Sequence, residues 1–127
     1  MKKINILVID PSPIIQIGFK TLFKSSSKFE LIECIDSIYD FNEFIKSNNI
    51  DIIITELTLV DGDAYDILKS IRLMSKEIPV LVFTNKSQKL HAIDILKNGA
   101  IGYLSKNSKK RKIKETLEKI ALQNFNF

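Results

Sequence analysis

Five times along the chain, a short and nearly continuous apolar run is followed by a segment with apolar residues at helical spacing. The apolar runs are residues 4–9, 29–35, 51–56, 79–84 and 101–104. Runs of this kind are typical of strands buried on both faces of a sheet, and such sheets are parallel and covered by helices. The alternation therefore predicts an α/β fold in which five strand–helix units form one doubly wound parallel sheet.

Residues at the expected helix boundaries support this alternation, because serine and aspartate favour the N-cap position. The predicted N-cap residues are Ser12, Ser37, Asp63 and Ser87. Pro13 suits the first position of its helix, and Gly99 suits the residue just after the fourth helix. In that fourth helix we expect Leu90, Ile93 and Leu96 to face the core.

The chain has 127 residues, so we expect a single domain over 1–127 with its core between residues 3 and 123. A hydrophobic share of 45% is enough to build that core.

The apolar run at 80–83 is far too short to cross a bilayer, and no signal-peptide cleavage site follows the first strand. We therefore expect a cytoplasmic protein without membrane contact. Cys34 and His91 are the only residues of their types, which argues against a disulfide, a Cys/His zinc site and a Ser-His-Asp triad.

Positive charge is concentrated near the end of the chain. Residues 109–119 carry six basic and two acidic side chains, which accounts for the whole net charge of +4. This segment could attract nucleic acid or an acidic partner. Because the chain contains only two arginines and no aromatic residue lies within the segment, we favour a solvated helix face over direct nucleic-acid binding.

Polar residues follow four of the predicted strands. Asp10 follows the first strand, Glu56 the third, Thr84 the fourth and Lys106 the fifth. In an open α/β sheet, ligands bind beyond the carboxyl ends of the strands. A pair of carboxylates can hold a hard divalent cation, a carboxylate can accept a phosphoryl group, and a hydroxyl with an ammonium can neutralise phosphoryl oxygens. We interpret these four residues as one functional site.

In four segments the sequence resembles the receiver domain of bacterial two-component response regulators, and the resemblance extends from Lys3 to about Gln123. The segments are Leu-Val-Ile-Asp-Pro-Ser-Pro at 7–13, Asp-Ile-Ile-Ile-Thr-Glu-Leu at 51–57, Val-Phe-Thr at 82–84 and Gly-Ala-Ile-Gly-Tyr-Leu-Ser-Lys at 99–106. The last is similar to receivers that precede a LuxR-type DNA-binding domain. The resemblance implies a flavodoxin-like fold, (βα)5, with strand order 2-1-3-4-5 and a Mg²⁺-dependent phosphorylation site.

By the resemblance, Glu56, Thr84 and Lys106 occupy the catalytic positions, Thr84 and Tyr103 the switch positions, and Asp10 and Glu56 the metal-ligand positions. Physically, Tyr103 could equally be a packing residue with its hydroxyl in water.

Two departures from the family pattern indicate a degenerate receiver. Pro11 stands where the second residue of an acidic pair is usual and has no ligand atom. Glu56 stands at the phosphoacceptor position. Its extra methylene moves the carboxylate away from the place from which an aspartate would attack the phosphoryl group, and it extends negative charge towards Lys106. We therefore predict weak or absent Mg²⁺ binding and an ion pair between Glu56 and Lys106 above Thr84.

Asp61 and Asp63 allow two interpretations. Either could replace a missing metal ligand, but Asp-Gly-Asp is common in turns and Asp63 is a good N-cap residue, so we favour the turn.

The leading hypothesis is a signal-transduction receiver domain that is independent of phosphorylation, is not an enzyme and acts through a protein partner, either a histidine kinase or an output protein. A homodimer through the last strand and helix is a further expectation. The alternatives are a working receiver that autophosphorylates on Glu56 with Mg²⁺, and the regulatory domain of a longer DNA-binding transcription regulator.

Overall fold

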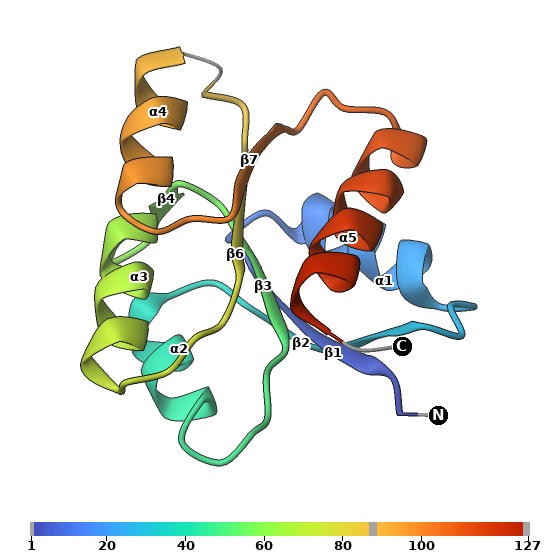
Figure 1. Ribbon diagram of the computed structural model, residues 1–127, viewed down its shortest axis with the longest axis horizontal. Helices are drawn as coiled ribbons and strands as arrows, with labels where there is room; N and C mark the ends of the chain where they lie inside the picture. The colour runs from blue at the N-terminus through green and yellow to red at the C-terminus, as the bar shows by residue number, and fades with distance from the viewer. Residues whose placement is uncertain (1, 87–88, 126–127) are drawn as a thin grey trace.

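The computed structural model describes residues 2–86 and 89–125, and within them a parallel sheet forms the centre of the molecule (Figure 1). The strands of this sheet are β1 (Ile4–Ile9), β2 (Phe29–Ile35), β3 (Ile52–Thr55), β6 (Val80–Thr84) and β7 (Gly102–Ser105). Their order is β2-β1-β3-β6-β7, which is the predicted 2-1-3-4-5 order of five strand–helix units. The three central strands are fully buried except for Asn5, as expected of strands covered on both faces.

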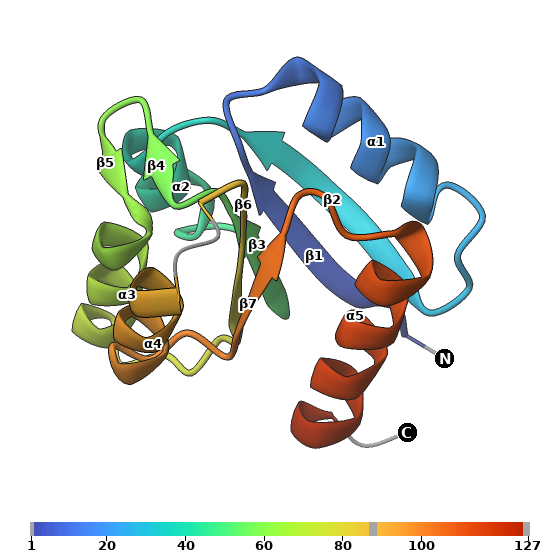
Figure 2. The same ribbon diagram turned by 90° about the horizontal axis from the view of Figure 1, so that it is seen from above.

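Helices cover both faces of the sheet (Figure 2). The helices are α1 (Pro13–Phe23), α2 (Ile38–Phe44), α3 (Ala64–Leu73), α4 (Lys89–Lys97) and α5 (Lys110–Asn124). Helices α1 and α5 lie on one face, and α2, α3 and α4 lie on the other. Each layer encloses a core cluster: Phe19, Phe23 and Leu117 belong to the first, and Phe41 and Ile67 to the second.

The helix boundaries follow the predicted capping chemistry. The Ser12 and Ser37 hydroxyls accept hydrogen bonds from the first turns of α1 and α2. Asp63 forms a reciprocal capping box with Asp66 at the start of α3. Gly99 has a φ of +111°, which explains why a glycine ends α4. The predicted cap at Ser87 lies outside the described residues.

The orientation predicted for α4 is wrong. Leu90 is 77% exposed, and Ile93 and Leu96 are also exposed, whereas the fully buried residue of this helix is Ile95. Helix α4 covers the sheet beside the edge strand β7 and reaches the core mainly through Ile95, so its second apolar stripe faces outward.

The loop expected around Asp61 contains a small additional sheet. Strands β4 (Thr58–Leu59) and β5 (Gly62–Asp63) pair antiparallel just before α3. Two-residue strands carry no alternating pattern, which is why the sequence did not predict them. No helix within the described residues is long and apolar enough to cross a membrane.

Candidate functional site

The four residues predicted from the strand ends meet at the carboxyl edge of the sheet. Asp10 follows β1, Glu56 follows β3, Thr84 ends β6 and Lys106 follows β7. All four line one hollow of about 460 Å³, together with neighbouring residues that include Pro11 and Lys86. The parallel arrangement of β1, β3, β6 and β7 brings them together, because the carboxyl ends of parallel strands share one edge.

The Lys106 ammonium joins two carboxylates. Its Nζ lies 2.7 Å from Glu56 Oε1 and 2.8 Å from Asp10 Oδ2. The side chains of Lys106, Asp10 and Glu56 are only 12%, 3% and 14% exposed. The predicted Glu56–Lys106 ion pair is therefore present, and Asp10 joins it in an arrangement that we call the Asp10–Lys106–Glu56 triad.

Glu56 is further held by groups around its second oxygen. The backbone N–H groups of Leu57 and Thr58 both donate to Glu56 Oε2, the latter at 3.4 Å. Burial raises the pKa of Glu56, but hydrogen bonds from Lys106 and Thr84 and the positive charge of Lys106 outweigh burial, so the pKa lies below its usual value. Glu56 is therefore ionised at neutral pH.

The pKa of Lys106 is shifted in the direction that favours its charged form. Burial lowers its pKa, but hydrogen bonds to Asp10 and Glu56 and their negative charges raise it more, so the ammonium is stabilised. The ammonium and both carboxylates thus satisfy one another inside a shielded hollow.

Asp10 is oriented by the start of α1. Its Oδ1 accepts a hydrogen bond from the Ser12 N–H at 2.8 Å, and its backbone carbonyl accepts one from Gln16 Nε2 at 2.7 Å. Pro11, between them, is exposed. The role of Gln16 carries no signal in the sequence, because it depends on the direction in which α1 leaves β1.

The residues at this edge offer a divalent cation few free side-chain ligand atoms. A Mg²⁺ site needs several oxygen ligands in near-octahedral geometry. Asp10 and Glu56 each have an oxygen engaged by Lys106, and Pro11 offers no side-chain ligand. Within the described part of the chain, no group of three acidic, histidine or cysteine residues is arranged to hold a metal.

Tyr103 lies beside the triad but does not contact it through an ion pair or hydrogen bond. Its ring packs partly against the core under α2, α3 and α4, and its hydroxyl donates a hydrogen bond to the Lys86 carbonyl oxygen. Burial, and next the negative charge of Glu56, raise the pKa of Tyr103. The Tyr103 hydroxyl is therefore bonded to the loop after β6, while its ring is partly packed.

Asp61 and Asp63 serve as turn and capping residues. The Asp61 carboxylate accepts hydrogen bonds from the Ile38 and Tyr39 N–H groups, at 2.7 and 3.0 Å, and so caps α2 from a distant loop. These bonds favour the charged form, and the pKa of Asp61 is lowered. Asp63 caps α3, as the turn interpretation expected, whereas the capping of α2 by Asp61 was not predicted from the sequence.

Comparison with known proteins identifies the family. The model of the response regulator receiver domain matches residues 6–118. The chain belongs to the response regulator receiver domain family. Fimbriae Z protein of Escherichia coli (strain K12) is 26% identical over 84% of this chain and 50% of its own length. A nitrate/nitrite response regulator protein homolog of Haemophilus influenzae is 26% identical over 94% of this chain and 57% of its own length.

Solved structures show the same fold. A two-component response regulator of the LuxR family from Aurantimonas sp. SI85-9A1 superposes with a TM-score of 0.87, at 20% identity over 99% of this chain and 90% of that one. A response regulator receiver domain protein from Clostridium thermocellum has a TM-score of 0.81, at 25% identity over 94% and 95%. The chain spans about half the length of the curated relatives named here.

Proposed function

We propose that this receiver domain works without a phosphorylation cycle, catalyses no reaction of its own and acts by binding another protein. The observation that carries this proposal is the Asp10–Lys106–Glu56 triad. An ammonium that would neutralise an incoming phosphoryl group is already bound by two carboxylates. Any phosphoryl oxygen entering the hollow must displace Glu56 or Asp10 from Lys106 and meets their negative charge.

Glu56 also places a negative charge where a phosphoryl group would carry one in a phosphorylated receiver. Its carboxylate reaches Lys106 and Thr84 at the same time, and two backbone N–H groups fix its other oxygen. We infer that this contact sets the conformation of the β6 and β7 ends without phosphorylation. In solution, Glu56→Gln should therefore shift the backbone resonances around Lys86 and Tyr103 more than those of β1.

The exposed apolar side chains of α4 support a protein contact on this side of the molecule. Leu90, Ile93 and Leu96 face outward, and Ile101 before β7 is also exposed. Several apolar side chains exposed on one helix are typical of an interaction site, whereas apolar residues exposed singly are normal. We propose that a histidine kinase, an output protein or a second copy of the chain binds across α4, β7 and the adjoining side of α5.

The decisive measurement is the intact mass of the protein after incubation with acetyl phosphate and Mg²⁺. We expect no added phosphoryl group, because Lys106 is paired and Pro11 removes a ligand position. A phosphoryl group located on Glu56 by peptide mapping would establish the alternative, a working receiver. A titration that saturates at sub-millimolar Mg²⁺ and is lost in Asp10→Ala would contradict the expectation of weak metal binding.

The lengths of the relatives favour one further candidate, the regulatory domain of a longer transcription regulator. Transcriptional regulatory protein ZraR of Salmonella typhimurium is 31% identical over 59% of this chain, a region that covers only 17% of ZraR. In this candidate the receiver itself does not contact DNA. Retention of the domain on duplex DNA at physiological salt, steeply lost as salt rises, would instead assign nucleic-acid binding to its own basic residues.

A further inference from the structure

Helices α1 and α5 lie on one face of the sheet, and a hollow of about 480 Å³ opens between them (Figure 2). Small-molecule sites in proteins are usually hollows of this size, with an apolar lining and a few polar groups. The polar side chains that line this one are Thr21, Lys106 and Lys110. Its apolar lining residues are Ile14, Ile15, Phe19, Leu22, Phe83 and Ile113. We call this space the α1–α5 hollow, and its composition is that of a small-molecule site.

Two aromatic rings lie at the bottom of the α1–α5 hollow. Phe19 of α1 and Phe83 of β6 are each 4% exposed, and their rings meet edge to face with centroids 5.3 Å apart. The partly buried side chains of Ile15 and Ile113 pack against the same core cluster from α1 and α5. A hydrocarbon chain in the hollow would therefore have core residues beneath it and a helix on each side.

Gly18 keeps the α1 side of the hollow open. It lies in the middle of α1 and lines the hollow. A Cβ added at this position would meet nothing within 4 Å, and no positive φ requires a glycine here. Glycine weakens a helix, so a role in folding does not explain its presence. What the missing side chain provides is space inside the hollow.

Lys110 gives the hollow a free positive charge. Thr21, Leu22 and Lys110 also line an adjoining hollow that continues along α5, so Lys110 lies where the two hollows meet. It forms no ion pair with any residue that the structure describes. The ammonium of Lys106, by contrast, is bound by the two carboxylates of the triad. An anionic group at the junction of the hollows would therefore meet a cation that is not already paired.

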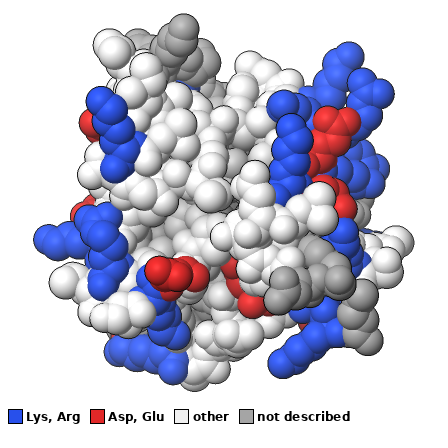
Figure 3. Space-filling model, viewed as in Figure 1, with Lys and Arg blue, Asp and Glu red and all other residues white. Residues whose placement is uncertain are grey.

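The first turn of α5 adds positive potential at the same place. Helix α5 begins at Lys110, its N-cap residue Lys109 forms no side-chain capping bond, and its first turn contains no acidic residue. Basic residues at a helix N-terminus are unfavourable, because the helix dipole is positive there. Figure 3 shows that lysine and arginine side chains gather over the side of the molecule formed by α5. These charges favour a ligand whose head group is negative.

We infer that the α1–α5 hollow binds a small apolar carboxylic acid, such as a medium-chain fatty acid, with its hydrocarbon part over Phe19 and Phe83 and its carboxylate at Lys110. The single free ammonium balances the single charge of a carboxylate, and the Thr21 hydroxyl can donate a hydrogen bond to it. The hydrocarbon part also contacts the aliphatic stem of Lys106, which lines the hollow, and so reaches the residue that holds the triad together. Such binding does not depend on whether the domain is phosphorylated.

Isothermal titration calorimetry tests the inference with probes of one chain length, used below the concentrations at which they form micelles. Decanoate should bind saturably, with one molecule per domain. Decanol has the same chain without the charge, and decyltrimethylammonium has the opposite charge, so both should bind at least tenfold more weakly. Along the series hexanoate, octanoate and decanoate, the affinity should rise about fourfold for each added methylene.

Three results would overturn the inference. Decanoate that shows no saturable binding would leave the hollow without a ligand of this class. Equal affinities for decanoate and decanol would mean that Lys110 holds no carboxylate. Sedimentation of the domain with vesicles of anionic phospholipid, without saturable binding of decanoate, would assign the basic and apolar residues to a membrane surface instead.

Variants then locate the site. Lys110→Gln should weaken decanoate binding at least tenfold and change decanol binding less than twofold. Gly18→Leu places a side chain in the open space and should weaken the binding of both probes at least tenfold, with circular dichroism to show that it is folded. Lys119→Gln, on α5 but outside the hollow, should change neither affinity more than twofold. Equal losses in Lys110→Gln and Lys119→Gln, or decanoate-induced chemical-shift changes confined to α4, would contradict the assignment.

Discussion

Lys106 determines the charge balance of the site, because its ammonium stands between two nearly buried carboxylates. Lys106→Met would leave Asp10 and Glu56 facing each other without a cation. Removing one partner from a buried ionic group costs about 3 kcal/mol or more of unfolding free energy. We therefore expect urea unfolding to show a loss of this order for Lys106→Met.

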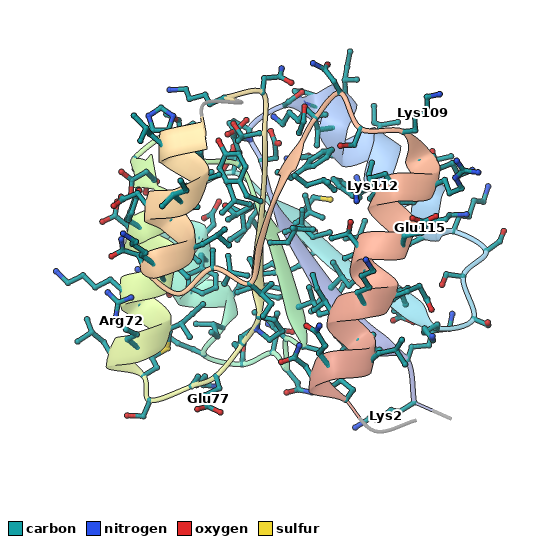
Figure 4. All side chains as sticks on the ribbon, turned by 45° about the horizontal axis from the view of Figure 1, so that its top comes forward. Lys2, Arg72, Glu77, Lys109, Lys112 and Glu115 are labelled. Carbon is teal, nitrogen blue, oxygen red and sulfur yellow. The ribbon has the colours of Figure 1, made fainter. Side chains whose placement is uncertain are left out.

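The matched control for this prediction is Lys112→Met, an exposed lysine of α5 (Figure 4). It should change stability by less than about 0.5 kcal/mol. In Lys106→Met/Glu56→Gln the second substitution removes one of the two opposed charges, so part of the loss should return. Additive losses in the double variant would mean that the residues do not act as one triad.

The pH dependence of stability follows from the directions of two pKa shifts. Glu56 has a folded-state pKa below its usual 4.5, so its contribution is present above pH 4.5 and is lost as pH falls through the folded value. Lys106 has a folded-state pKa above its usual 10.5, so its contribution is complete below pH 10.5 and is lost only as pH rises further. Between these limits both contributions are constant.

Glu56→Gln should therefore flatten the acid limb of the stability curve. The difference in unfolding free energy between the unmodified domain and Glu56→Gln should be largest near neutral pH and shrink below pH 4.5. Urea titrations at a series of pH values measure this difference directly. A difference that stays constant down to the acid transition would show that the charge of Glu56 contributes nothing to folding.

The sequence predicted the Glu56–Lys106 pair but not the contact between Asp10 and Lys106. The pair could be predicted because the lengths of the glutamate and lysine side chains allow them to meet across β6. The second contact was missed because Asp10 was interpreted only as a metal ligand. Its distance from Lys106 depends on the twist of the sheet and on the turn through Pro11, which residue types alone do not define.

At the scale of the elements, two glycines in or beside helices should respond to alanine with opposite signs. Gly99 has a φ of +111°, which an alanine adopts only with strain. Gly18 has helical geometry and open space around its Cα. We expect Gly99→Ala to destabilise the domain by about 1–2 kcal/mol and Gly18→Ala to stabilise it by about 0.5–1 kcal/mol.

Thermal unfolding of the two variants, each compared with the unmodified domain, measures both changes. The pair controls for the general effect of adding a methyl group. If Gly18→Ala were also destabilising, then α1 would need its glycine for folding, contrary to the open space around that position.

The boundaries of helices were predicted well where a local rule such as capping determines them. The side of a helix that faces the core was predicted less well where tertiary packing determines it. Ser12, Ser37 and Asp63 cap their helices because capping depends on neighbouring residues alone. The face of α4 was predicted wrongly because that helix has apolar residues on two sides. Only its position beside β7 determines that Ile95 packs inward while Leu90 stays exposed.

At the scale of the whole molecule, the five-strand architecture follows from repeated local patterns and the right-handed connection of parallel strands. The order of the strands came from the family resemblance, since the alternation of strands and helices is compatible with more than one order. The hollows lined by both α1 and α5 had no signal in the sequence, because they depend on how two helices from opposite ends of the chain pack together.

If the domain is independent of phosphorylation as proposed, we expect a phosphorylation cycle to require changes after two strands, because Pro11 and Glu56 both depart from the family pattern at one edge of the sheet. Glu56→Asp shortens the acceptor and releases Lys106 from one of its partners, but leaves Pro11 without a ligand atom. Pro11→Asp adds a carboxylate beside Asp10, but leaves Glu56 extended over Lys106. A misplacement of about 1 Å can reduce a reaction rate roughly a hundredfold, so each single variant should remain inactive with acetyl phosphate and Mg²⁺.

Glu56→Asp/Pro11→Asp removes both deficiencies at once, and we expect it to incorporate a phosphoryl group on residue 56 in a Mg²⁺-dependent manner. Intact mass after incubation, with and without a chelator, measures this outcome, and the two single variants are its controls. Far-ultraviolet circular dichroism should show that all three variants are folded. If Glu56→Asp alone were phosphorylated as fully as the double variant, the acceptor alone would account for the inactivity, and Pro11 would have no part in it. If the folded double variant stayed unmodified, the cause would lie in the surrounding structure, beyond these two residues.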